Sequence, residues 1–366
     1  MQIEKKKVAI VGTNGIPAKY GGFETLVEYL TKVLNNDFHF VVYCSSIYNK
    51  HERVAKYNNS RLIYLPLKAN GIQSLLYDIV ATFHAWFTAD VIIILGPSAG
   101  FILPLNYFFK KKIIVNHGGL NEWEREKLNF FQKKYVYLSH KIAAKCASFN
   151  IADNPPLSKN LEKSFRVSTK VIEYGGDHII KESLTSELQT KFSFLNEAYD
   201  LSVSRAQIDN NLHLLLIAYK ELPNRNLVLV SNWSISEYGI NLKKEYLNKY
   251  KNIFVVDAIY NKKELDVIRS NTSLYIHSHS RCGTAPSLVE AMHYNIPVIC
   301  FDVLTNRETT QHKSRYFSSS HELKLLVSSL SEVDRSELKK EMYDIAKHKY
   351  TWKLIAKKYA NLIQII

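Results

Sequence analysis

The sequence has few of the features that would reveal its class directly. Its 366 residues include only four cysteines, Cys44, Cys146, Cys282 and Cys300, with no CxxC pair and no Cys/His spacing typical of zinc. Scattered cysteines exclude a disulfide framework and indicate reduced thiols, as in a cytosolic protein. No apolar run reaches the roughly 18 residues needed to span a bilayer. The sequence also has no internal repeat and no low-complexity segment.

Acidic residues are too few to balance the basic ones, and the formal net charge is +14. Such a charge suits nucleic acid, an anionic membrane surface or phosphorylated substrates. The sequence has no helix-turn-helix, zinc-finger or RRM-like signature, so we expect no nucleic-acid partner. The first residues, MQIEKKKVAIV, have an apolar run too short for a signal peptide, and we expect a first strand there.

Apolar strand-like runs alternate with helical patterns along the whole chain, which predicts an α/β protein. The alternation occurs in two series, which indicates two doubly wound, Rossmann-like domains with mostly parallel sheets. We expect domains at 1–178 and 179–349, a linker within 176–196, and a helix over 350–366. Predicted strands lie at 8–11, 38–44, 62–65, 91–95, 113–116, 142–144, 149–152, 171–174, 199–203, 227–230, 253–256, 274–277 and 298–301. Predicted helices lie at 72–88, 98–109, 124–139, 210–222, 262–270, 286–293 and 337–347.

The first strand leads into a glycine-rich loop, GTNGIPAKYGG, and then into an amphipathic helix from about Phe23. Gly21 and Gly22 end this loop at the start of the helix. Glycines let the backbone approach a ligand closely, and helix-start N–H groups favour phosphate. The loop is therefore either a diphosphate cradle or an ordinary tight turn.

A second strand–loop–helix unit, YIHSHSRCGTAPSLVEAM, is the most informative stretch of the second half. Its helix begins near Pro286, and N–H groups around Gly283, Thr284 and Ala285 can face a phosphate. Glu290 follows about one turn later and suits ribose hydroxyls, although a solvated helix carboxylate is the alternative.

Three further positions carry charge or imidazole groups at strand ends. Arg205 follows a predicted strand, where a guanidinium can neutralise a leaving diphosphate. His117 follows another and can contact the donor sugar or orient the acceptor hydroxyl, or else has a structural role. His277 and His279 share a strand face, but we find no third metal ligand in the sequence and favour hydrogen-bonding roles.

Together, GTNGIPAKYGGFETLVEYL, HSRCGTAPSLVEAM and YTWKLIAKKYANLI resemble retaining glycosyltransferases of family 4 with the GT-B fold. More narrowly, the first segment resembles a bacterial polysaccharide subgroup that contains rhamnosyltransferases. The resemblance implies two domains facing a central cleft, a terminal helix that crosses back to the first domain, and no metal cofactor. It implies donor binding by Gly21, Gly22, Arg205 and Glu290, with Gly283, Thr284, Ala285 and Pro286 at the phosphate end.

The resemblance further implies that the segment NHGGLNEWER faces the acceptor. Candidate acceptor-binding residues are Tyr20, Glu24, Glu122, Trp123 and Arg125, although Trp123 can equally belong to the core. Catalytic candidates are His117, Arg205 and Glu290.

The sequence departs from the family pattern at two positions. Cys282 replaces the first of two glutamates spaced seven residues apart, so sugar recognition must differ. Asn210 replaces a lysine five residues after Arg205, which removes one cation from the diphosphate site. Both changes bear on whether donor binding is intact.

The sequence thus predicts a cytoplasmic enzyme that transfers a sugar, with rhamnose favoured, from a nucleotide-sugar to a lipid-linked saccharide in surface polysaccharide synthesis. Aromatic residues beside lysines at 101–112 and 130–134 suit an anionic membrane surface, and buried helices with a basic end are the alternative. The rival functions are a nucleotide-sugar 2-epimerase, an NAD-dependent dehydrogenase, and a basic non-catalytic binding protein. The first glycine loop lacks GxGxxG spacing, so the sequence does not support a dehydrogenase.

Overall fold

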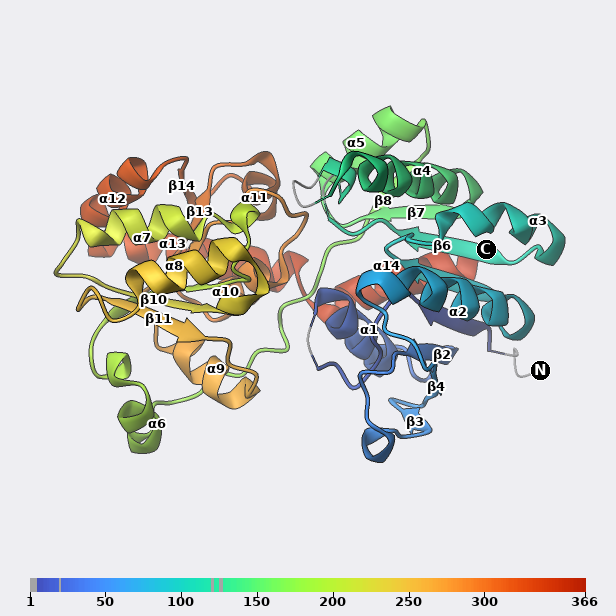
Figure 1. Ribbon diagram of the computed structural model, residues 1–366, viewed down its shortest axis with the longest axis horizontal. Coiled ribbons are helices and arrows are strands. Elements are labelled where there is room, and N and C mark those ends of the chain that lie inside the picture. Colours follow the sequence, from blue (N-terminus) through green and yellow to red (C-terminus); the bar gives the residue numbers. More distant parts are fainter. Residues whose placement is uncertain (1–4, 20, 120–121, 125–127) are drawn as a thin grey trace. The chain divides into compact units, whose positions relative to one another are not determined.

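A computed structural model describes residues 5–19, 21–119, 122–124 and 128–366, and the side chains of Ile72 and Glu122 are not among the described parts. The chain forms two compact units. Unit 1 contains residues 1–174 and 352–366, and unit 2 contains residues 175–351. Each has its own α/β sheet, so the predicted fold class is confirmed (Figure 1).

Unit 1 is built on an eight-stranded sheet of order β3-β4-β2-β1-β5-β6-β7-β8, parallel except for the β3–β4 pair. Its strands are β1 (Lys7–Val11), β2 (His39–Cys44), β3 (Lys56–Tyr57), β4 (Ser60–Tyr64), β5 (Val91–Leu95), β6 (Lys112–Asn116), β7 (Phe149–Ala152) and β8 (Thr169–Val171). Its α-helices are α1 (Gly22–Val33), α2 (Ser74–Thr88), α3 (Asn106–Phe109), α4 (Phe130–Cys146), α5 (Pro155–Phe165) and α14 (Trp352–Ile365). Short 3₁₀ turns are η1 (Lys50–Glu52), η2 (Gly71–Gln73), η3 (Gly100–Leu105) and η4 (Glu122–Glu124).

Helices α2, η3 and α4 cover one face of this sheet. Ala9, Val11 and Ile92 of the central strands pack there against Tyr77 of α2 and Ala143 of α4. These strands are apolar on both faces, as parallel core strands must be when helices cover both sides.

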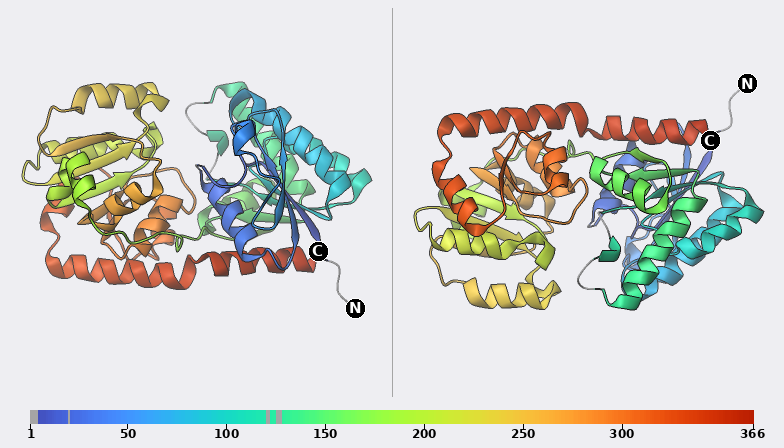
Figure 2. Two further views of the ribbon diagram at one scale, coloured as in Figure 1. Left: turned by 90° about the horizontal axis from the view of Figure 1, so that it is seen from below. Right: turned by 90° about the horizontal axis from the view of Figure 1, so that it is seen from above.

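The C-terminal helix α14 belongs to unit 1, as expected, although the chain reaches it only after the whole of unit 2. In Figure 2 the C-terminal helix runs alongside unit 1. Trp352 stacks on Tyr29 of α1 with ring centroids 5.1 Å apart. Asn116 at the end of β6 donates to the Tyr359 hydroxyl at 2.9 Å, and Lys358 pairs with Glu173. These contacts tie the end of the chain to the first sheet.

Unit 2 is built on an entirely parallel six-stranded sheet of order β11-β10-β9-β12-β13-β14. Its strands are β9 (Tyr199–Val203), β10 (Asn226–Ser231), β11 (Ile253–Asp257), β12 (Leu274–His277), β13 (Val298–Phe301) and β14 (Arg315–Phe317). Its α-helices are α6 (Ser186–Lys191), α7 (Leu212–Lys220), α8 (Glu237–Tyr246), α9 (Lys262–Ser270), α10 (Pro286–His293), α11 (Leu304–Thr309), α12 (Ser320–Ser329) and α13 (Glu332–Lys349). The 3₁₀ turns are η5 (Ser193–Asn196), η6 (Ile208–Asn210) and η7 (Trp233–Ile235). The core of unit 2 joins Leu227, Leu229 and Ile276 of the sheet to Leu215 of α7 and Val327 of α12.

One predicted strand is wrong. Residues 142–144 belong to α4, where Ala143 and Ala144 are buried on the helix face toward the sheet. A three-residue apolar run cannot by itself distinguish a strand from a helix interior. The same helix begins at Phe130 instead of 124, because Asn129 and Gln132 form a capping box at its start.

None of the described helices is long and apolar enough to cross a membrane.

Candidate active site

The glycine loop of unit 1 is shaped by close backbone approaches. Gly12, Gly15 and Gly21 all have positive φ values, which side chains rarely adopt. A Cβ on Gly12 would lie 2.1 Å from the Leu95 carbonyl oxygen, and one on Gly21 would lie 2.0 Å from Glu24 Oε2. The first contact packs the loop against strand β5, and the second allows Glu24 to fold over the loop.

Glu24 is buried and holds the loop from within. Its Oε1 accepts hydrogen bonds from the Asn14 backbone N–H at 2.8 Å, the Asn14 side chain at 2.9 Å and the Thr13 hydroxyl at 3.3 Å. A carboxylate with three internal donors positions backbone groups instead of facing solvent. Its proposed contact with an acceptor therefore stays a prediction, while its bonds to the loop are a feature that the sequence did not reveal.

His117 is likewise occupied by internal partners. Asn150 donates its amide to the Ala144 carbonyl at 3.0 Å, so its Oδ1 accepts from His117 Nε2 at 2.9 Å. The neutral ring then has only its Nδ1 lone pair left, and His140 Nδ1 lies 3.2 Å from it as the donor. Burial lowers the pKa of His117 to about 4. Both nitrogens of this neutral ring are satisfied, and its catalytic role stays a prediction.

The structure gives little information about the remaining acceptor candidates. Trp123 is 9% exposed and packs edge-on against Tyr137 and His140, with Phe165 also in contact, which supports the core alternative. Tyr20 and Arg125, like the Glu122 side chain, lie outside the described residues. Gly22 is the first residue of α1.

In unit 2, two loops at the carboxyl ends of neighbouring strands β9 and β12 are joined by hydrogen bonds. The Ser280 N–H and hydroxyl both donate to the Asp209 carbonyl at 2.9 Å. Ser278 donates to the Asn210 carbonyl at 2.5 Å, and the Asn211 side chain donates back to the Ser278 carbonyl at 3.0 Å. The loop after β9 and the loop before α10 therefore form one rigid frame.

Arg205 lies on this frame with its side chain exposed. Its carbonyl accepts from the Asn210 amide at 2.7 Å, so Asn210, where the family has lysine, fixes the loop instead of supplying charge. Among the described residues the Arg205 guanidinium has no hydrogen bond or ion pair. Its charge nevertheless acts on His279. Burial and the Arg205 charge together lower the pKa of His279 to about 3. Arg205 is thus an exposed cation, on a loop held by Asn210, that is available to a ligand.

The imidazoles of His277 and His279 lie together beside that cation, with ring centroids 4.3 Å apart. His277 Nδ1 and His279 Nε2 are buried and have no hydrogen-bond partner within the described part of the chain. Burial lowers the pKa of both groups, so both rings are neutral near pH 7. A buried polar atom without a partner is costly unless a ligand satisfies it.

Cys282 completes a group of three possible metal ligands with these histidines, all within 4.8 Å of one another. The expectation that no third ligand exists is therefore wrong. The Cys282 thiol lies 4.0 Å from His277 Nε2 and 3.7 Å from Asn306 Oδ1. The nearby Arg205 charge opposes a further cation at this place, because like charges repel strongly in a desolvated site.

Helix α10 begins directly after this group. Ala285 is its N-cap residue without a side-chain cap, Pro286 occupies the first turn, and no acidic residue lies there. The positive end of the helix dipole therefore has no protein counter-charge in the first turn. Gly283, Thr284 and Ala285 are buried beside it, as phosphate-end residues would be.

Glu290 on the same helix is bound by two basic side chains that the sequence did not point to. Its Oε2 lies 2.7 Å from Arg269 Nη1 and its Oε1 lies 3.2 Å from His178 Nε2. Burial opposes its ionisation, but the Arg269 charge and the His178 hydrogen bond prevail and lower the pKa of Glu290 to about 2. Glu290 is therefore a permanent anion, 12% exposed.

A groove of about 880 Å³ in unit 2 lies elsewhere. It is lined by Tyr199, Ser273 and Pro297, at the amino ends of β9, β12 and β13. Ligands of doubly wound sheets bind beyond the carboxyl ends of strands. We therefore place the candidate site at the Arg205–α10 frame and not in this groove.

Comparison with known families and structures shows the enzyme class and the fold. The family model "Glycosyl transferases group 1" matches residues 186–349, and the model "Domain of unknown function (DUF1972)" matches residues 5–177. Residues 186–349 are thus a group 1 glycosyltransferase domain, and the chain is a glycosyltransferase with the GT-B fold. No curated protein sequence matches the chain.

Several solved structures share this fold over almost their whole length. Sucrose-phosphate synthase from Thermosynechococcus elongatus has a TM-score of 0.81 at 16% identity, with 98% of both chains covered. HepE from Anabaena, in complex with UDP-glucose, has a TM-score of 0.75 at 15% identity, with 99% of this chain and 100% of HepE covered. A glycosyltransferase from Rickettsia africae has a TM-score of 0.72 at 14% identity, with 98% of both chains covered. At such identities the likeness concerns the fold alone.

Proposed function

We propose that this glycosyltransferase transfers a sugar from a nucleoside-diphosphate sugar to a lipid-linked saccharide in surface polysaccharide synthesis, at the cytoplasmic side of the membrane. The observation that carries the donor half is the frame around Arg205. A free guanidinium, two neutral imidazoles with unpartnered nitrogens and an uncapped helix start gather at one sheet edge. All of them complement an anionic diphosphate.

In the reaction, the bond between the sugar C1 and the diphosphate oxygen breaks as the acceptor hydroxyl oxygen bonds to C1, and the hydroxyl proton leaves with the departing diphosphate. Arg205 and the α10 N-terminus would stabilise the negative charge that develops on the leaving diphosphate. Glu290, held ionised by Arg269 and His178, would accept hydrogen bonds from the ribose hydroxyls. Retention of the anomeric configuration and a rhamnosyl donor rest on the family resemblance.

We expect the reaction to need no metal ion, because Arg205 and the helix start would supply the positive charge. Turnover should therefore persist in EDTA. A different result would assign a metal to the group of His277, His279 and Cys282. In that case EDTA would abolish turnover, zinc would restore it, and zinc would not restore it in the Cys282→Ala variant.

The first experiment is thermal stabilisation against UDP, GDP, dTDP, CMP and NAD. A ligand that binds only the folded state raises the melting temperature by mass action. One nucleoside diphosphate should stabilise the wild type and should have no effect on Arg205→Ala and Glu290→Ala. A response to NAD alone would overturn the transferase proposal.

The second experiment supplies the matching nucleotide-sugars, with dTDP-rhamnose and UDP-glucose among them, to the enzyme with and without a lipid-linked saccharide. A new glycosidic bond with retained configuration, identified by NMR, would support the proposal. An isomerised nucleotide-sugar formed without acceptor would identify a 2-epimerase instead.

A further inference from the structure

Unit 1 exposes a row of large apolar side chains on helix α2. Leu76, Val80, Phe83 and Phe87 recur at helical spacing on the side away from the sheet, and Phe87 is 65% exposed. On the opposite side of the same helix, Tyr77 and other residues pack into the core. Helix α2 is therefore apolar on both sides, which a water-facing helix is not.

Neighbouring elements of the same unit expose further aromatic side chains. Tyr107 and Phe108 of α3 are 80% and 76% exposed, and Phe130 and Phe131 of α4 are 74% and 79% exposed. We call the six side chains of Phe83, Phe87, Tyr107, Phe108, Phe130 and Phe131 the aromatic face.

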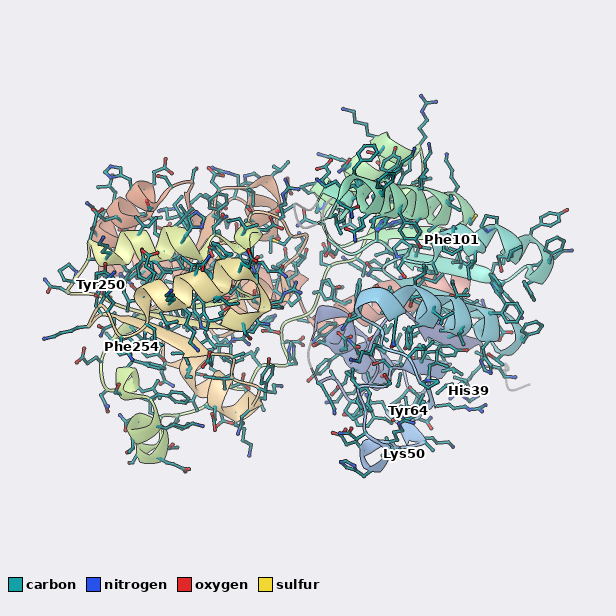
Figure 3. The ribbon with its side chains drawn as sticks, viewed as in Figure 1. His39, Lys50, Tyr64, Phe101, Tyr250 and Phe254 are labelled. Carbon is teal, nitrogen blue, oxygen red and sulfur yellow. The ribbon has the colours of Figure 1, made fainter. Side chains whose placement is uncertain are left out.

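Ring contacts connect the elements that carry the aromatic face. Phe109, the last residue of α3, contacts α2, with its ring 5.1 Å from Phe87 and 6.2 Å from Phe83. Phe101 of η3, labelled in Figure 3, lies 6.2 Å from Tyr135 of α4. The Tyr135 hydroxyl in turn donates to the Ser98 carbonyl at 2.6 Å, which fixes α4 beside η3.

The exposed apolar area is larger than a solvated surface normally carries. An aromatic side chain has about 150–250 Å² of surface, so six that are mostly exposed amount to several hundred Å². Patches of this size on a monomer usually mark a binding site for a protein or a membrane.

The exposed charges beside the aromatic face are mainly basic. Lys110, Lys112, Lys134 and Lys141 are exposed on or next to α3 and α4. Residues 100–112 and 129–146 contain no Asp or Glu, and the single acidic residue of α2, Asp78, is buried. Asp90, which follows α2, and Glu124 of η4 are exposed acidic residues near these segments. An apolar surface bordered mainly by cations matches a bilayer interface with anionic headgroups.

We propose that the aromatic face docks on an anionic lipid bilayer, with its rings among the headgroups and the lysines on the lipid phosphates. A second copy of this chain would be a poor occupant, because a symmetric contact would bring the same lysines together. This inference rests on the proposed function, in which the acceptor is lipid-linked, and it adds the surface through which the enzyme reaches that acceptor.

The test is vesicle flotation of the full chain with phosphatidylcholine alone and with phosphatidylcholine and phosphatidylglycerol at about 3:1, at roughly 0.05 M and roughly 0.5 M salt. The wild type should float with the anionic vesicles and be released at the higher salt. Phe130→Ser/Phe131→Ser should reduce the partition coefficient at least about tenfold. Lys110→Gln/Lys134→Gln should reduce it by about tenfold as well.

The matched control is Ile240→Ser/Val333→Ser, which removes two exposed aliphatic residues from unit 2 and should float like the wild type. Failure of the wild type to float would overturn the proposal. So would equal flotation of the aromatic variant, or a concentration-dependent dimer in solution that Phe130→Ser/Phe131→Ser abolishes.

Thermal stabilisation by the matching nucleoside diphosphate separates this proposal from the proposed function. The flotation variants should retain it, because none of the changed residues belongs to the Arg205–α10 frame. Loss of flotation with nucleotide binding intact would assign the effect to the aromatic face. Flotation without any thermal stabilisation by nucleotide would support membrane docking by the aromatic face and overturn the proposed donor site.

Discussion

Each unit of the protein buries a pair of neighbouring histidines at the end of a sheet strand, and the two pairs differ in how their nitrogens are used. In unit 1, His117 is satisfied by Asn150 and His140. In unit 2, His277 Nδ1 and His279 Nε2 have no hydrogen-bond partner among the residues that the structure describes. Both pairs are neutral near pH 7 because burial lowers their pKa values.

The difference teaches where recognition groups are left for a ligand. A buried imidazole with both nitrogens paired is a structural element, and its removal affects folding. A buried imidazole with an unpaired nitrogen destabilises the ligand-free protein, and a ligand that bonds to this nitrogen removes that destabilisation. From this comparison we expect a structural role for the first pair and a ligand-binding role for the second.

The largest expected effect is a loss of activity when a group of the candidate site in unit 2 is removed. Arg205→Ala should lower kcat/KM for the nucleotide-sugar by roughly 10²–10³, because a fixed positive charge at the leaving group is lost. Because Arg205 is exposed and unpaired among the described residues, the melting temperature should stay within about 1–2 °C of the wild type. Steady-state kinetics and calorimetry check both values.

The control for Arg205 is Arg315→Ala, which removes another exposed arginine of unit 2 on strand β14. It should leave kcat/KM unchanged. If both variants lose activity alike, the general positive charge of the protein, and not the frame around Arg205, accounts for the effect.

The next effect concerns pH and the histidine pair of unit 1. The pKa of His117 falls from 6.5 in the unfolded chain to about 4 in the folded protein. Between these two values the unfolded chain binds more protons, so the free energy of unfolding should decrease as the pH falls from 6.5 toward 4. At about 1.4 kcal/mol for each pH unit, His117 alone contributes roughly 3 kcal/mol of this loss.

Urea unfolding between pH 7 and pH 4 measures this dependence. His117→Asn should show a shallower decrease than the wild type, although it is less stable at pH 7. The other buried histidines change stability in the same direction, so the comparison is the difference between the two slopes. Parallel slopes would show that His117 is not the buried neutral group that its two hydrogen bonds require.

A smaller effect separates the two pairs directly. His140→Ala should lower the free energy of unfolding by about 1–3 kcal/mol, because it leaves His117 Nδ1 buried and unpaired. It should not change nucleotide binding by unit 2. His279→Ala should do the reverse, with a roughly tenfold weaker affinity for the nucleoside diphosphate and little change in stability.

Calorimetric unfolding and nucleotide titration of these two variants provide the measurement. If both variants lose stability equally and bind nucleotide equally well, the contrast between paired and open nitrogens carries no functional meaning. Glu290→Ala can serve as a reference in the titration, because it changes the same unit at a different contact.

Much of the fold could be predicted from the sequence, because parallel core strands are short apolar runs that end at glycine or polar residues. Strands such as β5 and β9, and helices such as α9 and α10, have the predicted bounds. The predicted strand at 142–144 failed because its apolar run was one side of a helix. Local pattern could not resolve it without the partner that it packs against.

The candidate site could be predicted only as a set of positions. Arg205, Glu290 and the start of α10 follow from strand–loop–helix order. The partners of Glu290, namely Arg269 and His178, lie on segments whose sequences give no signal of the contact. The role of Glu24 was also hidden, because nothing in its helix spacing shows that its carboxylate turns back onto Asn14. Tertiary hydrogen bonds of this kind depend on the folded path of the chain.

The smallest expected effect concerns Cys282, which has replaced a family glutamate beside the open histidines. Its thiol lies 3.7 Å from Asn306 Oδ1, and Asn306 is held by the carbonyls of His279 and Phe301. A serine hydroxyl can donate to the same oxygen, so Cys282→Ser should keep nucleotide affinity and kcat/KM within about twofold. Cys282→Glu should lower nucleotide affinity and kcat/KM more than Cys282→Ser does, because it buries a carboxylate near the donor diphosphate. If Cys282→Ser abolished donor binding while stability was unchanged, the sulfur itself would be a ligand, and the open histidines would have to be interpreted together with it.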